Sequence, residues 1–141
     1  MEPSALYDLA QKQNIPVLTY PMPYNGSMSV MEDGQCFVGM DGSVCDGGAL
    51  ETVHLAHELG HCLTGSFYSI HTAVDSRLRH EVRADKWAIE RLIPVEALDD
   101  AIASGIHTTW ELAEHFGVTE AFIRKAVCWH VHGNLATELY F

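Results

Sequence analysis

Residues 49–65 read ALETVHLAHELGHCLTG and predict a helix that is buried on most sides. Apolar residues dominate this stretch, no proline interrupts it, and the glycine at its end is a common C-terminal stop. At about 100° per residue, the polar side chains fall within an arc of roughly 120°. They are Glu51, His54, His57, Glu58 and His61. A mostly apolar helix with one strip of His and Glu is suited to lining a cleft.

The centre of this helix, residues 57–61, carries the pattern H-E-x-x-H. Side chains four residues apart lie on one helix face, about 6 Å apart along the axis. His57 and His61 can therefore direct their imidazoles at one metal ion. Glu58 is turned by about 100° from His57, so it can take a proton from a water molecule on that ion. The pattern predicts a metal site with Glu58 as the general base.

A second helix, predicted over residues 77–93, carries two carboxylates on its apolar side. Glu81 and Asp85 point about 180° away from the solvated face of the same helix, which carries Arg79 and Arg83. Carboxylates that face a core are strongly disfavoured unless cations or donors meet them. A Zn²⁺ ion bound by Glu81 and an imidazole N–H held by Asp85 would satisfy both. Two histidines and one glutamate leave a fourth position for water, as in catalytic zinc sites.

These residues carry a resemblance to a known family. The sequence HELGH followed by EVRAD at residues 81–85 looks like the zinc site of thermolysin-like peptidases. Residues 54–61 and 83–94 are similar to the ImmA/IrrE family of small metallopeptidases. The resemblance implies one zinc ion with ligands His57, His61 and Glu81, and catalytic Glu58. It also implies a protein substrate, such as a helix-turn-helix repressor of a phage, mobile element or stress regulon.

The position of the third ligand needs a choice between two residues. Many members of the family carry Glu where Arg83 stands in this sequence. We place the ligand at Glu81 because it shares the core-facing side with Asp85, whereas Arg83 faces solvent.

Four further residues are candidates for the cleft, namely His54, Tyr68, His71 and His80. His54 lies in the polar arc, where a partly exposed residue that does not bind metal is expected. The other three are candidate donors to the oxyanion of the transition state, a role that such peptidases need.

The expected fold class is α+β, a mostly helical, zincin-like single domain over residues 1–132. A small antiparallel sheet from residues 17–40 is expected beside the active-site helix, with residues 35–40 as an edge strand that can accept an extended substrate. Residues 133–141 are expected to form a tail that is at least partly disordered. The remaining predicted elements are helices at 4–14, 95–104, 109–116 and 118–129 and a strand at 27–31.

Composition narrows the possible partners and the compartment. Eight basic and nineteen acidic residues give a net charge of -11, which disfavours direct binding to nucleic acid. No apolar run is long enough for a bilayer, and the first residues lack the pattern of a signal peptide. We therefore expect a cytoplasmic protein with no membrane association. Its four cysteines form no C-x-x-C pair and are expected to be reduced thiols.

Two other functions are compatible with the sequence. One is a zinc-binding regulatory or interaction module without turnover. The other is a DNA-associated regulator, since residues 112–124 resemble half of a helix-turn-helix. The second helix of that segment has only Arg124 and Lys125 as cations, which favours packing or partner docking over DNA reading.

Overall fold

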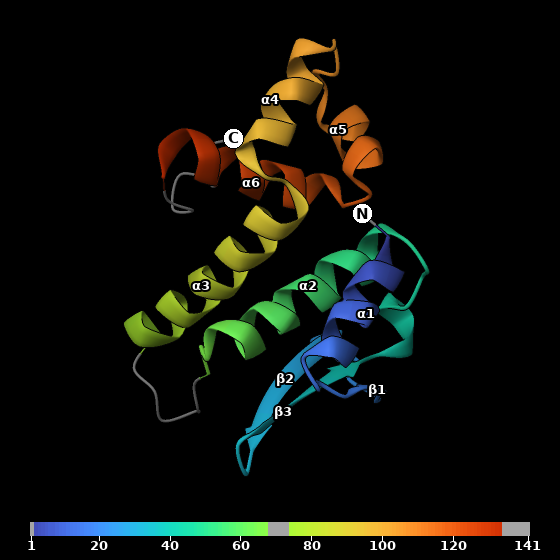
Figure 1. Ribbon diagram of the computed structural model, residues 1–141, viewed down its shortest axis with the longest axis vertical. Helices are drawn as coiled ribbons and strands as arrows, with labels where there is room; N and C mark the ends of the chain where they lie inside the picture. Colours follow the sequence, from blue (N-terminus) through green and yellow to red (C-terminus); the bar gives the residue numbers. More distant parts are fainter. Residues whose placement is uncertain (1, 68–73, 134–141) are drawn as a thin grey trace.

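A computed structural model describes residues 2–67 and 74–133 of the chain (Figure 1). Within these ranges it forms a mostly helical α+β domain, which confirms the predicted fold class. The elements are α1 (Pro3–Lys12), β1 (Val17–Thr19), β2 (Ser27–Glu32), β3 (Gln35–Met40), the 3-10 helix η1 (Gly42–Val44), α2 (Ala49–Thr64), α3 (Val74–Leu92), α4 (Val95–Ala103), α5 (Thr109–Phe116) and α6 (Glu120–His132). The expected tail begins at Gly133, which caps α6; its remainder lies outside the described residues.

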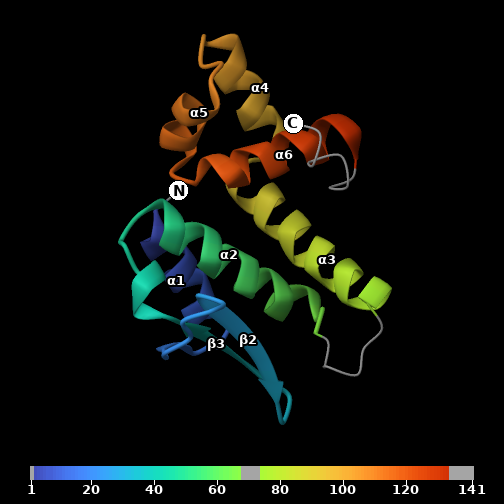
Figure 2. The same ribbon diagram turned by 180° about the vertical axis from the view of Figure 1, so that it is seen from behind.

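Helix α2 is the central element of the arrangement. It lies over the sheet and contacts α1, α3, β2 and β3. Helix α3 crosses beside α2, and α4, α5 and α6 gather at its far end, away from the sheet (Figures 1 and 2). Helix α6 then returns to contact α3. The α2–α3 pair therefore lies between the sheet and the C-terminal helices.

The sheet is mixed, whereas the sequence predicted an antiparallel one. Strands β2 and β3 form the expected hairpin, and both turn residues, Asp33 and Gly34, have the positive φ that a tight two-residue turn requires. Strand β1 pairs in parallel with β3, so the strand order is β1-β3-β2. The assignment of residues 35–40 as an edge was wrong, because β1 occupies the second side of β3. The edge that contacts α2 is β2.

One continuous apolar cluster connects the elements from α1 to α6. Its fully buried members include Leu55 and Leu59 of α2, Ile89 of α3 and Ile123 of α6. Burial of such side chains stabilises a fold by roughly 1.5–3 kcal/mol each. Among the described residues, no helix is long and apolar enough to cross a membrane.

A disulfide joins the sheet to α2. Cys36 of β3 and Cys62 of α2 are bonded, with their Cα atoms 5.8 Å apart. This pair corrects the expectation that all four cysteines are reduced. The two residues are 26 positions apart and meet because α2 packs on the sheet, a contact that no local cysteine spacing reveals.

We expect that removing this bond by Cys36→Ser lowers the free energy of unfolding by about 3 kcal/mol. The physical reason is that the unfolded chain regains the conformational freedom of the loop that the bond closes. Urea unfolding without reductant measures the effect, with Cys45→Ser as the matched control. The parent protein should lose a similar amount in reductant, and the Cys36→Ser variant should not respond to it. A parent that is insensitive to reductant would contradict the prediction.

Candidate metal centre

A close approach of two helix backbones positions the centre. An ideal Cβ at Gly60 of α2 would lie 2.6 Å from the carbonyl oxygen of Ala84 and 3.0 Å from its Cα. Glycine is required at such a contact because any side chain would push the backbones apart. Ala84 of α3 is fully buried against this point. The contact sets the carboxylates of α3 beside the histidines of α2.

We therefore expect Gly60→Ala to destabilise the fold by roughly 2 kcal/mol. The gain in helix propensity, about 1 kcal/mol, is smaller than the cost of forcing α2 and α3 apart. Gly42→Ala is the matched control, because a Cβ at Gly42 meets nothing within 4 Å. Denaturant unfolding of both variants measures the difference. Equal stability of Gly60→Ala and the parent would refute the proposed steric role of this glycine.

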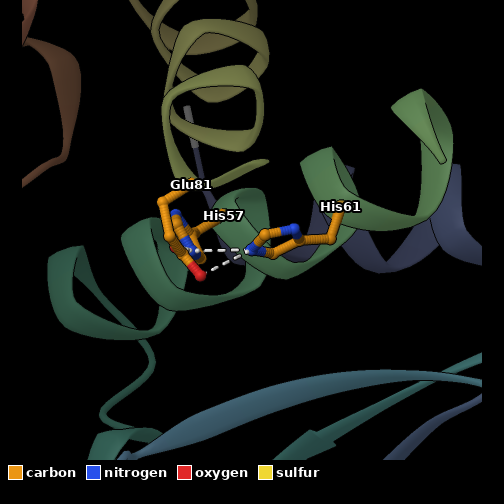
Figure 3. A group of neighbouring side chains, drawn as sticks. All are labelled: His57, His61 and Glu81. Atoms are coloured by element: carbon orange, nitrogen blue, oxygen red, sulfur yellow. Dashed lines mark hydrogen bonds and ion pairs between the residues drawn. The ribbon is translucent and has the colours of Figure 1, made fainter. Parts of the chain in front are cut away.

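Two imidazoles and one carboxylate converge between α2 and α3 (Figure 3). The Nε2 atoms of His57 and His61 are 3.2 Å apart. Glu81 lies beside both rings, with Oε2 at 2.8 Å from Nε2 of His57 and Oε1 at 3.3 Å from Nε2 of His61. The structure thus brings together the three residues that the sequence pattern selected as metal ligands.

The spacing of these donor atoms fits a zinc ion. Zinc binds His nitrogen and carboxylate oxygen at about 2.0–2.2 Å in a tetrahedron, so its ligand atoms lie roughly 3.3 Å from one another. The observed separations of 2.8–3.3 Å are close to that value. Two imidazole nitrogens and one glutamate carboxylate are also a donor set that catalytic zinc sites use.

The orientation of His57 is fixed from behind by a charged pair. Its Nδ1 lies 2.7 Å from Oδ1 of Asp85, and Oδ2 of Asp85 accepts from Nζ of Lys125 at 3.2 Å. Burial disfavours the imidazolium, but hydrogen bonds to Asp85 and then Glu81 outweigh it and raise the pKa of His57 to about 10. Burial opposes ionisation of Asp85 too, yet His57 and Lys125 together lower its pKa. The pair of Asp85 and Lys125 therefore fixes the ring of His57 so that Nε2 faces Glu81.

The orientation of His61 comes from the end of its own helix. Its Nδ1 donates to the backbone carbonyl of Ser66, at 2.5 Å, which directs Nε2 at Glu81. Gly65 ends α2 in the left-handed conformation and turns Ser66 back toward the ring. Burial tends to lower the pKa of His61, and the bonds to Glu81 and Ser66 raise it overall.

Glu58 lies in the same cleft without being part of the three-residue group. The cavity has a volume of about 630 Å³ and opens between α2, β2, α3 and α6. Glu58 is buried, and its Oε2 accepts a hydrogen bond from the Ser27 hydroxyl at 2.8 Å. A carboxylate held beside a metal-binding group can act as a general base.

The structure places the other candidates differently. His54 is half-buried and lines the cleft. His80 is half-buried and is not one of the described residues that line it. Tyr68 and His71 lie outside the described residues. Glu51, which belonged to the predicted polar arc, turns away from the cleft and accepts from the Tyr7 hydroxyl.

Three residues of the centre escaped the sequence analysis, namely Ser27, Ser66 and Lys125. Lys125 and the cleft-lining Phe122 show that α6 contributes to the centre, in addition to the packing or partner docking expected for its segment. Ser66 had a local signal, because it follows the glycine that ends α2, the helix of His57 and His61. Ser27 and Lys125 had none, since long-range packing brings them to the site.

The comparisons with known proteins agree with this geometry. The sequence profile of the IrrE N-terminal-like domain, a family of peptidases, matches residues 50–127. The chain belongs to this family. No curated protein and no solved structure matches it. The matched part of this IrrE-like peptidase begins in α2 and ends in α6, so it contains the His57, His61 and Glu81 group and also Lys125. Family membership supports a metallopeptidase, and the three-residue group fits a metal ion, for which zinc is typical.

Proposed function

We propose that this IrrE-like protein is a zinc-dependent endopeptidase that hydrolyses peptide bonds of a protein substrate. One zinc ion would be held by His57, His61 and Glu81. The observation that carries the proposal is the convergence of these three residues in a cleft that also holds Glu58.

The chemistry assigns a separate role to each part of the site. A zinc ion bound here would polarise the scissile carbonyl and lower the pKa of a water molecule. Glu58 takes a proton from the attacking water and passes it to the leaving amine. Asp85 keeps the Nδ1 proton on His57, so that Nε2 of the neutral ring faces the metal position.

The edge of β2 supports binding of an extended peptide. The carbonyl of Gly26 accepts from the backbone N–H of Asp41, so Gly26 and Asp41 form a hydrogen-bonded pair of the antiparallel ladder. Every second residue of β2 from there bonds to β3. The N–H and C=O groups of the residues between them, Ser27, Ser29 and Met31, point away from β3 and are open to another strand. Ser27 and Ser29 also line the cleft. A substrate strand that pairs with this edge would pass in front of Glu58 and be held by its main chain.

The finer proposal concerns the substrate and the compartment. We infer that the substrate is a helix-turn-helix repressor of a phage, mobile element or stress regulon, and that it is cleaved in the cytoplasm. The resemblance to the ImmA/IrrE family supports this substrate class. The net charge of this chain, -11, also favours action on the repressor protein over direct binding to the DNA that the repressor occupies. The cation of α6 closest to the site, Lys125, is already paired with Asp85.

The test of the function is metal-dependent cleavage of a purified helix-turn-helix repressor of the proposed substrate class. Incubation of the two purified proteins with zinc should yield discrete fragments in mass spectrometry. A zinc chelator should abolish the fragments, and added zinc should restore them, because Glu58 needs an activated water. Fragments that persist in the chelator would point to a contaminating peptidase and contradict the proposal, as would an intact substrate under all conditions.

A further inference from the structure

A line of three side chains reaches from the edge strand to Glu58. Ser27 is the first residue of β2, and its Oγ lies 2.7 Å from Nδ1 of His54 and 2.8 Å from Oε2 of Glu58. Ser27 and Glu58 are only 7% and 6% exposed. The hydroxyl is therefore shielded from water and placed between one base and one carboxylate.

The count of protons fixes the direction of these bonds. A hydroxyl group has one proton to donate, and an ionised carboxylate can only accept. Ser27 therefore donates to Glu58 and must accept from His54, so Nδ1 of His54 carries a proton. In the neutral ring Nε2 is then an acceptor, which makes His54 unsuitable as a donor to a developing oxyanion.

The backbone of the strand also holds the imidazole in place. Gly26 has a φ of +77°, and an ideal Cβ there would lie 2.8 Å from Cε1 of His54. The ring is thus packed directly against the backbone of Gly26, with Val44 on the same spot at 3.0 Å from that Cβ position. This packing restricts the rotation of the ring, and the hydrogen bond to Ser27 selects the flip in which Nδ1 faces the hydroxyl.

We propose that Ser27 and His54 are positioning residues that hold the general base Glu58 in its working orientation. The chain His54–Ser27–Glu58 occupies one carboxylate oxygen and leaves the other to take the proton of the attacking water. Because Ser27 begins the edge strand β2, the strand that would pair with the peptide also orients the base. The proposal rests on the function proposed above, in which Glu58 is that base.

Nuclear magnetic resonance of the zinc-loaded full chain tests the bonds without any substrate. The ¹⁵N-detected imidazole signals of His54, identified by their loss in His54→Gln, should show a proton on Nδ1 that exchanges slowly with water. We expect exchange to become at least tenfold faster in Ser27→Ala and in Glu58→Ala. The matched control Ser104→Ala, at a distant serine whose hydroxyl donates to the carbonyl of Ala101 in its own helix, should leave the signal unchanged. An unprotonated Nδ1 in the parent, or exchange that ignores Glu58→Ala, would overturn the chain of bonds.

Cleavage kinetics on the helix-turn-helix repressor of the functional test also tests the positioning role. Ser27→Ala should lower kcat by about ten- to a hundredfold, the range expected when a catalytic group is misplaced, with KM and zinc content unchanged. Ser27→Thr keeps the hydroxyl and should recover most of kcat, which a merely structural role for the serine would not predict. Unchanged kcat in Ser27→Ala overturns the proposal. A parent without turnover but with the expected His54 signal instead counts against the proposed function and leaves the hydrogen bonds intact.

Discussion

Replacing Glu58 by glutamine should abolish peptide hydrolysis and leave zinc bound. The amide has nearly the same size and can still accept from Ser27, so the packing of this buried side chain is kept. It cannot take a proton from water, and loss of a general base typically costs between about a hundredfold and ten-thousandfold in rate. Single-turnover cleavage of the helix-turn-helix protein and zinc content by atomic absorption measure the two halves of this prediction.

The matched control is Glu90→Gln, which makes the same change at an exposed position of α3. This control should cleave at the parental rate. A Glu58→Gln variant that cleaves as fast as the control would contradict the assignment of the base. If neither the parent nor the variants cleave while all bind zinc, the alternative of a zinc-binding module without turnover gains support.

Replacing Glu81 by alanine should weaken zinc binding by more than a hundredfold. Residues that only orient a ligand cost roughly ten- to a hundredfold in metal affinity when changed, and loss of a direct ligand should cost more. The Glu81 side chain is 35% exposed, so its removal should perturb the core little. Competition with a chromophoric chelator measures the affinity, and the zinc-dependent rise in Tm provides a second readout.

Arg83→Ala is the matched control for this prediction. Arg83 is exposed on the same helix, two residues after Glu81, and is the position set aside when the third ligand was placed. We expect Arg83→Ala to leave zinc affinity within about threefold of the parent, because salt screens the effect of a solvent-exposed cation on the metal site. Zinc binding that depends on Arg83 and not on Glu81 would place the third ligand elsewhere and contradict the geometry of the centre.

The sequence was sufficient where local chemistry determines structure. The glycine after Thr64 marks the end of α2, and Asp33-Gly34 marks the hairpin, so both elements were predicted nearly to the residue. The sheet was predicted less well, because a parallel partner for β3 leaves no short-range signal. Strand β1 is only three residues long, and its pairing decides which strand lies at the edge.

The same distinction applies to the candidate centre. Helical periodicity placed His57 with His61 and Glu81 with Asp85, and the cost of burying two carboxylates without a cation linked the two pairs as a hypothesis. Contacts without such a chemical requirement could not be predicted. The Ser27 hydroxyl comes from a strand, and Cys36 meets Cys62 across the same packing interface. Serine and cysteine have too many ordinary roles for their type alone to indicate such contacts.

The bond between Lys125 and Asp85 has a consequence for how the centre is assembled. A chain is synthesised from its N-terminus, and Lys125 follows Asp85 by 40 residues. The two histidines and Glu81 thus leave the ribosome well before the cation that offsets the charge of Asp85. Until α6 has been synthesised, Asp85 therefore lacks the cation that offsets its charge, and the electrostatic setting of His57, His61 and Glu81 is incomplete.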